Sequence, residues 1–510
     1  MIFMKAIRSL CTISLLLAAA WSLAAQNPWK DGDNITGIRV GKHPARQSSA
    51  LLFGSMENGG FRPAFEAASF WKAGVRAGTE VHEGSVSLAG NFSFTQKEGK
   101  DMMRSMFVHP GLYPFDLIEF TPGPKTLQTY AFDGGLAWGF SERWTVGGKV
   151  RFEADNYAKR KDLRHTNYYQ DITVLPAVKY SFGTDRKLHI GLNGCYRSKS
   201  ESVQAEQLGA SGQTYDVFLD KGMMYGEREV WDGDGVHLAE AGVNRFPVRE
   251  QTWGAAIQAS YDAGLYGEFA YSRSFGEVGE KGYVWMRFPG EQVTARLTYL
   301  TEKGNYKGIF RLELKSNLQH LNEFAVDREN KGGVVTPVSY TDAPKELSRR
   351  HTRSFQFRYD LYSRKLPHLL VLARRTWITE KATPVYPFAD SVGVNIYSCT
   401  VAADYPVGRF LLGAKVDYSG GKADQPGLRN IDPSIPVEKP YRLEGDWVRR
   451  MEYMTADRLG LTLSARYAFA LGSVKGLFVG AEASWTHGFN VAVLPGSDRK
   501  SATLQCGINF

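Results

Sequence analysis

The sequence lacks the long apolar runs of a helical membrane protein. Only the N-terminus carries such a run, and the mean hydropathy of the 510 residues is −0.31. A bundle of transmembrane helices, each needing about 20 apolar residues, is therefore excluded. A transmembrane β-barrel is not excluded, because only every second residue of its strands meets lipid.

Cysteine is scarce as well. Of four cysteines, Cys11 lies near the N-terminus, and Cys195, Cys399 and Cys506 are scattered through the rest of the chain. If Cys11 is removed with an N-terminal signal peptide, three isolated cysteines remain, and this odd number provides neither a disulfide framework nor the spacing of a zinc site. We therefore predict no metal site and no cofactor.

Catalytic motifs are also missing, with neither a G-x-S-x-G elbow nor an H-E-x-x-H sequence. His189 with Ser87 or Asp171 could form a triad inside a barrel, but a plain inward-facing histidine explains it more simply. Trp231-Asp232-Gly233-Asp234-Gly235 lacks the closing glutamate of a calcium loop and reads as a turn. The sequence predicts no enzyme.

Charge is mildly positive and spread out. Met1 to about Ala25 has the basic start, apolar core and small residues of a secretory signal peptide. Removing Lys5 and Arg8 with it lowers the formal charge from +9 to +7. No run of like charges marks a nucleic-acid partner. The predicted organisation is a signal peptide (1–25), an N-terminal periplasmic segment or first strand (26–62) and a β-barrel (63–510).

The last ten residues alternate strictly. Ala502, Leu504, Cys506, Ile508 and Phe510 fall on one face of an extended strand, and polar residues or glycine fall on the other. A terminal phenylalanine on such a strand resembles the signal by which the outer-membrane assembly machinery captures barrel proteins. The pattern predicts a location in the cell outer membrane, with Phe510 as assembly signal and the assembly machinery and membrane lipid as partners.

The same alternation recurs along the chain in hairpins. Short turns join the strands within each hairpin, and long connections join successive hairpins. Short periplasmic turns and long extracellular loops are typical of an antiparallel up-and-down transmembrane β-barrel, for which we predict about 18 strands, or about 16 if one hairpin is loop. The predicted strands are 49–54, 70–81, 86–95, 128–140, 144–154, 172–180, 188–196, 253–261, 265–271, 293–299, 306–314, 355–361, 369–377, 394–402, 410–418, 459–469, 477–485 and 501–510.

Charges separate by face in these strands. A lysine or arginine facing lipid at mid-depth costs roughly 2–4 kcal/mol, so the charged face should line a wet lumen. A β-sandwich would also sort its charges, onto its solvent face. Arg374 and Arg375 are adjacent, so one of them must point outward or lie at a bulge. The candidate lumen-lining residues are Lys149, Arg151, Glu153, Lys179, Arg197, Arg296, Arg311, Glu313, Arg358, Lys415, Asp417 and Glu482.

Two long connections could carry function. Residues 200–250 and 420–454 are rich in charges and aromatics, and either could fold inward as a constriction that sets selectivity. Both could equally remain external loops with solvated charges.

The whole chain after the signal peptide resembles an uncharacterised family of outer-membrane β-barrel proteins from Bacteroides-type Gram-negative bacteria. The resemblance rests on Asn27-Pro28-Trp29, on the hairpin series and on the Gly507-Ile508-Asn509-Phe510 ending. It implies the barrel fold but carries over no substrate and no site residue.

Three functions remain open from the sequence. A barrel of this size usually leaves an aqueous channel, which predicts a porin-like protein or a transport accessory beside an uptake receptor. Inward lysines and arginines would favour small anionic solutes. A non-conducting surface barrel whose loops bind a partner is the alternative, and an outer-membrane hydrolase is the third.

Overall fold

The structure is a computed structural model that describes residues 27–41, 44–206, 215–232, 235–236, 245–262, 264–280, 283–331, 334–363, 366–424 and 427–510. The expected signal peptide (1–25) and the side chains at 231–235 lie outside this description. The described residues contain 22 β-strands in one antiparallel sheet. Leaving out β8, β9, β10 and β19, 18 strands form the wall of a barrel. The wall strands are β1 (Arg46–Gly59), β2 (Ser69–Glu83), β3 (Val86–Ser105), β4 (Asp116–Trp138), β5 (Trp144–Lys159), β6 (Arg164–Phe182), β7 (Leu188–Glu206), β11 (Arg245–Tyr261), β12 (Leu265–Glu280), β13 (Tyr283–Lys303), β14 (Tyr306–Lys331), β15 (Val334–Ser363), β16 (His368–Ala382), β17 (Phe388–Val407), β18 (Phe410–Ala423), β20 (Arg458–Leu471), β21 (Val474–Gly488) and β22 (Asp498–Asn509).

The wall closes on itself. Successive wall strands pair with each other, and β1 pairs with β22 in the register Ser49↔Asn509. Backbone hydrogen bonds between Ser48 and Phe510 complete the seam. The prediction of an 18-strand antiparallel barrel is confirmed, and the alternative of two stacked sheets is excluded. Among the described residues, no helix has the length and apolarity to cross a membrane.

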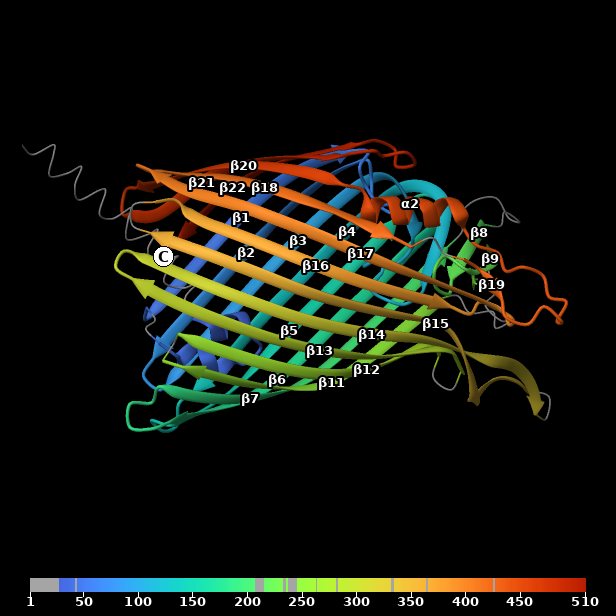
Figure 1. Ribbon diagram of the computed structural model, residues 1–510, viewed down its shortest axis with the longest axis horizontal. Helices are drawn as coiled ribbons and strands as arrows, with labels where there is room; N and C mark the ends of the chain where they lie inside the picture. The colour runs from blue at the N-terminus through green and yellow to red at the C-terminus, as the bar shows by residue number, and fades with distance from the viewer. Residues whose placement is uncertain are drawn as a thin grey trace, which may run out of the picture.

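The two ends of the barrel differ. We call the end with the short turns the turn end and the opposite end the loop end. Figure 1 shows the C-terminus near the turn end, at the left, and helix α2 (Glu444–Thr455) with the short strands β8 (Tyr215–Asp220) and β9 (Gly226–Asp232) at the loop end. This asymmetry follows from the two lengths of connection in the sequence.

An apolar band surrounds the outside of the wall. On β12, Leu265, Phe269 and Tyr271 are exposed, whereas the alternate residues Tyr266 and Glu268 are buried on the inner face. On this strand an outward charge follows only towards the loop end, where Arg273 lies 3.9 Å from Glu291 of β13. The exposed large apolar side chains on the wall strands therefore form a belt about nine residues tall, the span expected of a strand that crosses a bilayer.

The strands continue beyond this belt, so the predicted loop boundaries were too wide. Residues 316–350, expected as a long loop, form the upper parts of β14 and β15, which pair as far as Lys331↔Val334. Likewise β3 extends to Ser105 and β7 to Glu206. Above the belt both faces of a strand meet polar surroundings, and the hydrophobic alternation that marks a strand in the sequence disappears.

The two adjacent arginines of β16 divide between the faces. Arg374 lines the central cavity. Arg375 lies on the outer face, where its guanidinium stacks 4.9 Å from the Trp377 ring and its Nε donates to Asn395 Oδ1 at 3.1 Å. An outward arginine is accommodated here because it has an aromatic and a polar neighbour and its aliphatic stem covers apolar surface.

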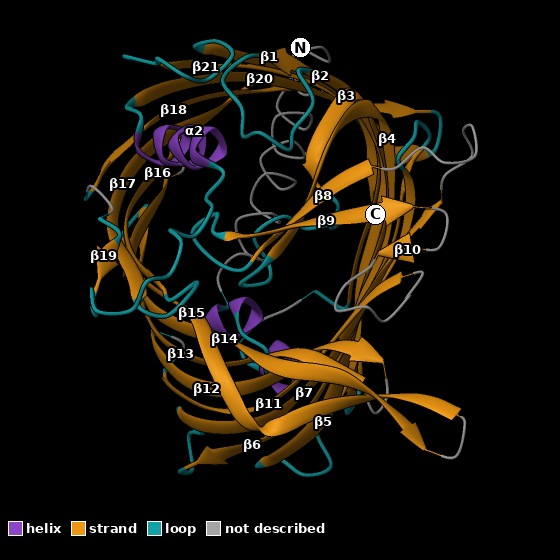
Figure 2. Ribbon diagram, turned by 90° about the vertical axis from the view of Figure 1, so that its right-hand side faces the viewer, coloured by secondary structure: helices purple, strands orange, loops and turns teal. Residues whose placement is uncertain are grey.

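Several segments fold into the barrel instead of away from it. Figure 2, which looks in from the loop end, shows α2 and the β8–β9 hairpin inside the ring of wall strands. The short strands β10 (Gly235–Val236) and β19 (Arg429–Asn430) pair with β9 and β17. At the turn end, the 3-10 helices η1 (Pro28–Asp31) and η2 (Ile35–Arg39) pack against the inner wall. The apolar cores of the protein therefore lie inside the barrel.

Candidate functional site: the central cavity

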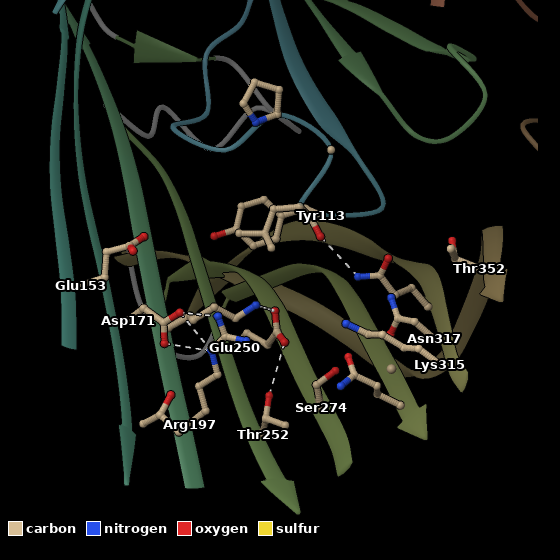
Figure 3. Close-up of a pocket in the computed structure, with 18 of the residues that line it drawn as sticks. Tyr113, Glu153, Asp171, Arg197, Glu250, Thr252, Ser274, Lys315, Asn317 and Thr352 are labelled. Carbon is tan, nitrogen blue, oxygen red and sulfur yellow. Dashed lines mark hydrogen bonds and ion pairs between the residues drawn. The ribbon is translucent and has the colours of Figure 1, made fainter. Parts of the chain in front are cut away.

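A cavity of about 1460 Å³ occupies the interior between the inward-folded segments. Its lining comes from wall strands around much of the barrel, from the loop between β3 and β4, and from α2. Figure 3 shows part of this lining, with Glu153, Asp171, Arg197, Glu250 and Lys315 directed into one space. Charged side chains therefore line part of the cavity, in contrast to the apolar outer surface of the wall.

Three of the predicted lumen residues lie on the cavity wall, namely Arg151, Glu153 and Arg197. Arg151 bridges Asp133 of β4 and Asp33 of the N-terminal segment, with nitrogen–oxygen distances of 2.8 and 2.5 Å. Arg197 is hydrogen-bonded to Asp171 on β6. These arginines are neutralised by carboxylates and do not provide free positive charge.

The other predicted residues lie elsewhere on the inner face, and most of them are paired too. Arg296 contacts Glu268 and Glu313, and both Arg311 and Arg358 contact the fully buried Asp360. Lys149 pairs with Asp133, and Lys415 pairs with Asp417. Lys179 is buried, and Glu482 is exposed on the inward side of β21 opposite Ser464 and Thr503.

Five cations on the cavity wall make no hydrogen bond or ion pair with any described residue, namely Arg76, Lys315, Arg349, Arg374 and Lys381. Lys315 lies on β14 and Arg374 on β16. Asn317 lies next to Lys315 in Figure 3, and Thr352 of β15, which pairs with Asn317, lines the same cavity. Sequence reasoning did not single out Lys315, because a charge on the inner face does not disclose whether a carboxylate faces it.

The N-terminal segment, residues 27–40, fills one side of the interior near the turn end. Trp29 is buried there, with its Nε1 donating to Ser260 Oγ at 2.9 Å and its ring packed edge-on against Tyr266. A Cβ atom at Gly191 would lie 2.7 Å from that ring, so only glycine allows this approach. Asn34 Nδ2 donates to Gln258 Oε1 at 2.9 Å, and Ile35 and Ile38 pack against Ala137 and Ala177.

The loop between β3 and β4, residues 106–115, enters the barrel from the loop end, and we call it the inner loop. Phe107, Tyr113 and Phe115 pack against Phe246 of β11 and Phe288 of β13. Arg350 Nη2 donates to the carbonyl oxygens of Gly111 and Tyr113 at 2.9 and 3.2 Å. Aromatic residues beside Pro110, Gly111 and Pro114 in an expected surface loop were the sequence signal for this buried role.

One histidine fixes the inner loop to the wall. His109 Nε2 lies 3.1 Å from Asp155 Oδ2 and 3.2 Å from Glu153 Oε1, both on β5. Burial alone would lower the pKa of His109, but the hydrogen bonds to Asp155 and Glu153 outweigh that effect and raise the pKa to about 9. The ring also packs edge-on against Tyr169, 4.9 Å away.

The two charged connections of interest also reach inward. Around the turn between β8 and β9, Met223 and Tyr225 are buried with Trp447 of α2, and Tyr225 donates to Asp390 at 2.7 Å. Arg450 of α2 is hydrogen-bonded to Glu380 on β16. Both connections thus narrow the interior at the loop end.

The structure does not bring His189 together with Ser87 or Asp171 as a catalytic triad. His189 Nδ1 lies 2.9 Å from Ser181 Oγ, and Asp171 is bound to Arg197. Ser87 instead lies 2.8 Å from His82 Nδ1. His82 in turn contacts Glu80, but Ser87 is fully buried beneath Arg39, which donates to it at 2.9 Å. This cluster ties the N-terminal segment to β2 and β3.

Comparisons with known proteins give a family and several similar architectures. A family model described as "Family of unknown function (DUF6850)" matches residues 42–510. No curated protein matches the sequence.

Among solved structures, the RagAB peptide transporter is similar at 8% identity and a TM-score of 0.43, covering 92% of this chain and 75% of that one. The copper transporter OprC is similar at 10% identity and a TM-score of 0.40, covering 91% and 80%. A mutant of the ferric enterobactin receptor (PfeA) from Pseudomonas aeruginosa is similar at 9% identity and a TM-score of 0.40, covering 92% of this chain and 81% of that one. The closed barrel itself is established by the strand pairings described above.

Proposed function

Because the chain belongs to the family of unknown function DUF6850, whose description assigns no activity, we propose from its geometry that it is an outer-membrane β-barrel that admits small anionic solutes through its central cavity. The observation that carries the proposal is the contrast between the two faces of one wall. An apolar belt surrounds the outside, and a charged cavity of about 1460 Å³ lies inside.

The apolar belt supports the membrane location. Side chains such as Leu297, Phe269 and Leu463 would be exposed to water in a soluble barrel, and each gains when lipid covers it. Aromatics including Trp138, Trp144, Tyr261, Tyr299 and Tyr306 are exposed near the short turns, as in the girdle at a membrane interface. The proposal predicts that the protein needs detergent to stay in solution.

The C-terminal residue supports assembly in that membrane. Phe510 is exposed at the turn end, next to the seam between β1 and β22, and Arg46 lies 5.9 Å from its ring. An exposed aromatic at the closing strand is available to the barrel assembly machinery before the seam forms. The variant Phe510→Ala should accumulate less in the outer membrane, while the purified variant should still refold in detergent.

The preference for anions is proposed on the unpaired cations of the cavity wall, of which Lys315 and Arg374 are two. The paired arginines contribute little net field, whereas Lys315 and Arg374 present uncompensated charge to the cavity. A unit charge about 4 Å from a solute anion contributes about 1 kcal/mol even at the dielectric of water, or roughly fivefold in partitioning. Solutes that fit a cavity of this size and carry a carboxylate or phosphate are the expected class.

Recording from the purified barrel in planar bilayers tests this function. Wild-type protein should conduct, with a reversal potential in a salt gradient that indicates anion preference. Arg374→Gln should reduce that preference, and Arg375→Gln, which removes the neighbouring charge from the outer face, should not. Lys315→Gln should act like Arg374→Gln, with Lys415→Gln as the control because Lys415 does not line the cavity.

A barrel that inserts but stays electrically silent would contradict the proposal. The inward-folded segments at both ends would then favour the alternative, a closed barrel that binds a partner or serves an uptake receptor through its loop end. Equal reversal potentials for Arg374→Gln and Arg375→Gln would refute the assigned anion site alone.

A further inference from the structure

We propose that His109, Glu153 and Asp155 form a binding site for a divalent first-row transition-metal ion, and that the bound ion crosslinks the inner loop to β5. The three residues offer one imidazole nitrogen and two carboxylate oxygens whose ligand atoms all lie within 4.8 Å of one another. Nitrogen and oxygen donors of this kind suit ions such as Zn²⁺.

Two of the three distances between ligand atoms are close to those of a metal site. His109 Nε2 lies 3.2 Å from Glu153 Oε1 and 3.1 Å from Asp155 Oδ2. Two ligand atoms that each lie about 2.1 Å from a tetrahedral ion are about 3.4 Å apart. Separating the imidazole from each carboxylate by a few tenths of an ångström brings both pairs to that spacing, and His109 releases its proton to the solvent when its nitrogen binds the ion.

A second observation points to the same place. The Asp155 side chain is fully buried, and its Oδ1 has no hydrogen-bond partner among the described residues. An unsatisfied carboxylate oxygen in a buried position is costly. Coordination of a cation by Asp155, through one or both oxygens, removes that cost, which the hydrogen bond from His109 to Oδ2 does not.

The site is held in place and open on one side. Val108, next to His109, donates its backbone N–H to Glu201 Oε1 at 2.8 Å and packs against Tyr157 and Tyr169. His109 and Glu153 remain 39% and 38% exposed, and Glu153 lines the central cavity. Three protein ligands with one accessible position are the arrangement of a site that keeps a water or an exchangeable ligand on the metal.

A metal ion bound at His109, Glu153 and Asp155 would restrict the motion of the inner loop. The inner loop carries Tyr113 and Phe115, which line the cavity, and the loop meets β5 at His109. An ion between them resists withdrawal of the loop, so metal should reduce the mobility of residues 106–115. A reduced flux of solute would follow only if the proposed function holds, whereas metal binding does not depend on it.

Sequence reasoning missed this site because His109 is separated from Glu153 and Asp155 by the whole of β4. The latter two are alternate residues of one strand, which places both on its inner face. Nothing in the local sequence indicates that a loop folds back over them.

Calorimetry in detergent tests the site, with protein that carries no polyhistidine tag. Wild type should bind one Zn²⁺ per chain, and Mg²⁺ should not compete. Since loss of an outer-shell partner already costs about 10–100-fold in affinity, His109→Gln and Asp155→Asn should each weaken binding by about 100-fold or more. His351→Gln is the matched control, because His351 is bound to Ser316 away from the site.

Heat-modifiable mobility in electrophoresis establishes that each variant is a folded barrel, and Asp155→Asn serves if His109→Gln does not fold. Zn²⁺ should also slow amide hydrogen exchange of residues 106–115 in wild type and not in Asp155→Asn. Equal affinity of wild type and both variants, or no binding by wild type, overturns the proposal. Binding without slower exchange overturns the crosslink. A barrel that binds Zn²⁺ yet never conducts would refute the proposed function and leave the metal site standing.

Discussion

Replacing Trp29 by alanine should release the N-terminal segment from the interior of the barrel. The indole is fully enclosed, and it supplies both an edge-on contact with Tyr266 and a hydrogen bond to Ser260. Because the segment is joined to the wall mainly by such side-chain contacts and does not belong to the sheet, its binding can fail while the wall remains intact.

The magnitude follows from the loss of a buried aromatic. Truncation of a buried tryptophan to alanine costs about 3–5 kcal/mol. Each 1.4 kcal/mol is tenfold, so the equilibrium between the docked and released segment should shift by about 10²- to 10⁴-fold. The remaining contacts of Asp33, Asn34 and Arg39 persist in the variant and retain part of the docking energy.

Limited proteolysis of the folded barrel in detergent, followed by mass spectrometry, measures the release. Trp29→Ala should be cleaved within residues 27–40 far faster than wild type, with the wall strands still resistant. Trp253→Ala is the control, because Trp253 is exposed on the outer face of β11. Unchanged cleavage in Trp29→Ala, with heat-modifiable mobility retained, would refute the reasoning that Trp29 anchors the segment.

Three further changes probe the wall and the inward-folded segments. Phe269→Arg places a cation at mid-height on the outer belt and should lower the free energy of unfolding in lipid vesicles by about 2–4 kcal/mol, measured by urea titration. Ser274→Arg, on the cavity face, should be tolerated. Equal losses of free energy in the two variants would contradict the assignment of faces. Asp360→Asn leaves two arginines facing an uncharged side chain and should lower the free energy of unfolding by about 3 kcal/mol. If Asp404→Asn lowers it by as much, the buried position of Asp360 does not strengthen its ion pairs. Burial raises the pKa of Asp220, in β8, to about 6, against a hydrogen bond from the backbone N–H of Gly222. Protonated Asp220 therefore stabilises the folded state. This stabilisation is complete below the unfolded pKa of 3.8 and is lost as pH rises through about 6. Amide exchange of β8 and β9, corrected for intrinsic rates, should slow between pH 7 and pH 4, and the same slowing in Asp220→Asn would exclude Asp220 as its cause.

The wall could be predicted from the sequence because one face of each strand meets a uniform apolar environment. Each of the 18 predicted ranges overlaps a wall strand, including 49–54, which lies within β1. The periodicity of two survives wherever the belt continues. It fails above the belt, which explains why the upper parts of β14 and β15 were mistaken for a loop.

The interior could be predicted only in part. Alternation assigns Arg151 and Arg197 to the inner face, but it cannot tell which carboxylates neutralise them. Asp33 reaches Arg151 from a segment 118 residues away in the chain. The same limit applies to the inner loop, since Phe107 of the loop packs against Phe246 of β11, far along the chain, and no local sequence pattern indicates that contact.

The N-terminal segment also has a consequence for how the molecule is made. Trp29 binds Ser260 and Tyr266, residues synthesised more than two hundred positions later. Residues 27–40 thus have no surface to pack against until β11 and β12 have joined the sheet. The N-terminal segment therefore packs into the barrel late in biogenesis. Its packing requires that β11 and β12 have already paired in the correct order.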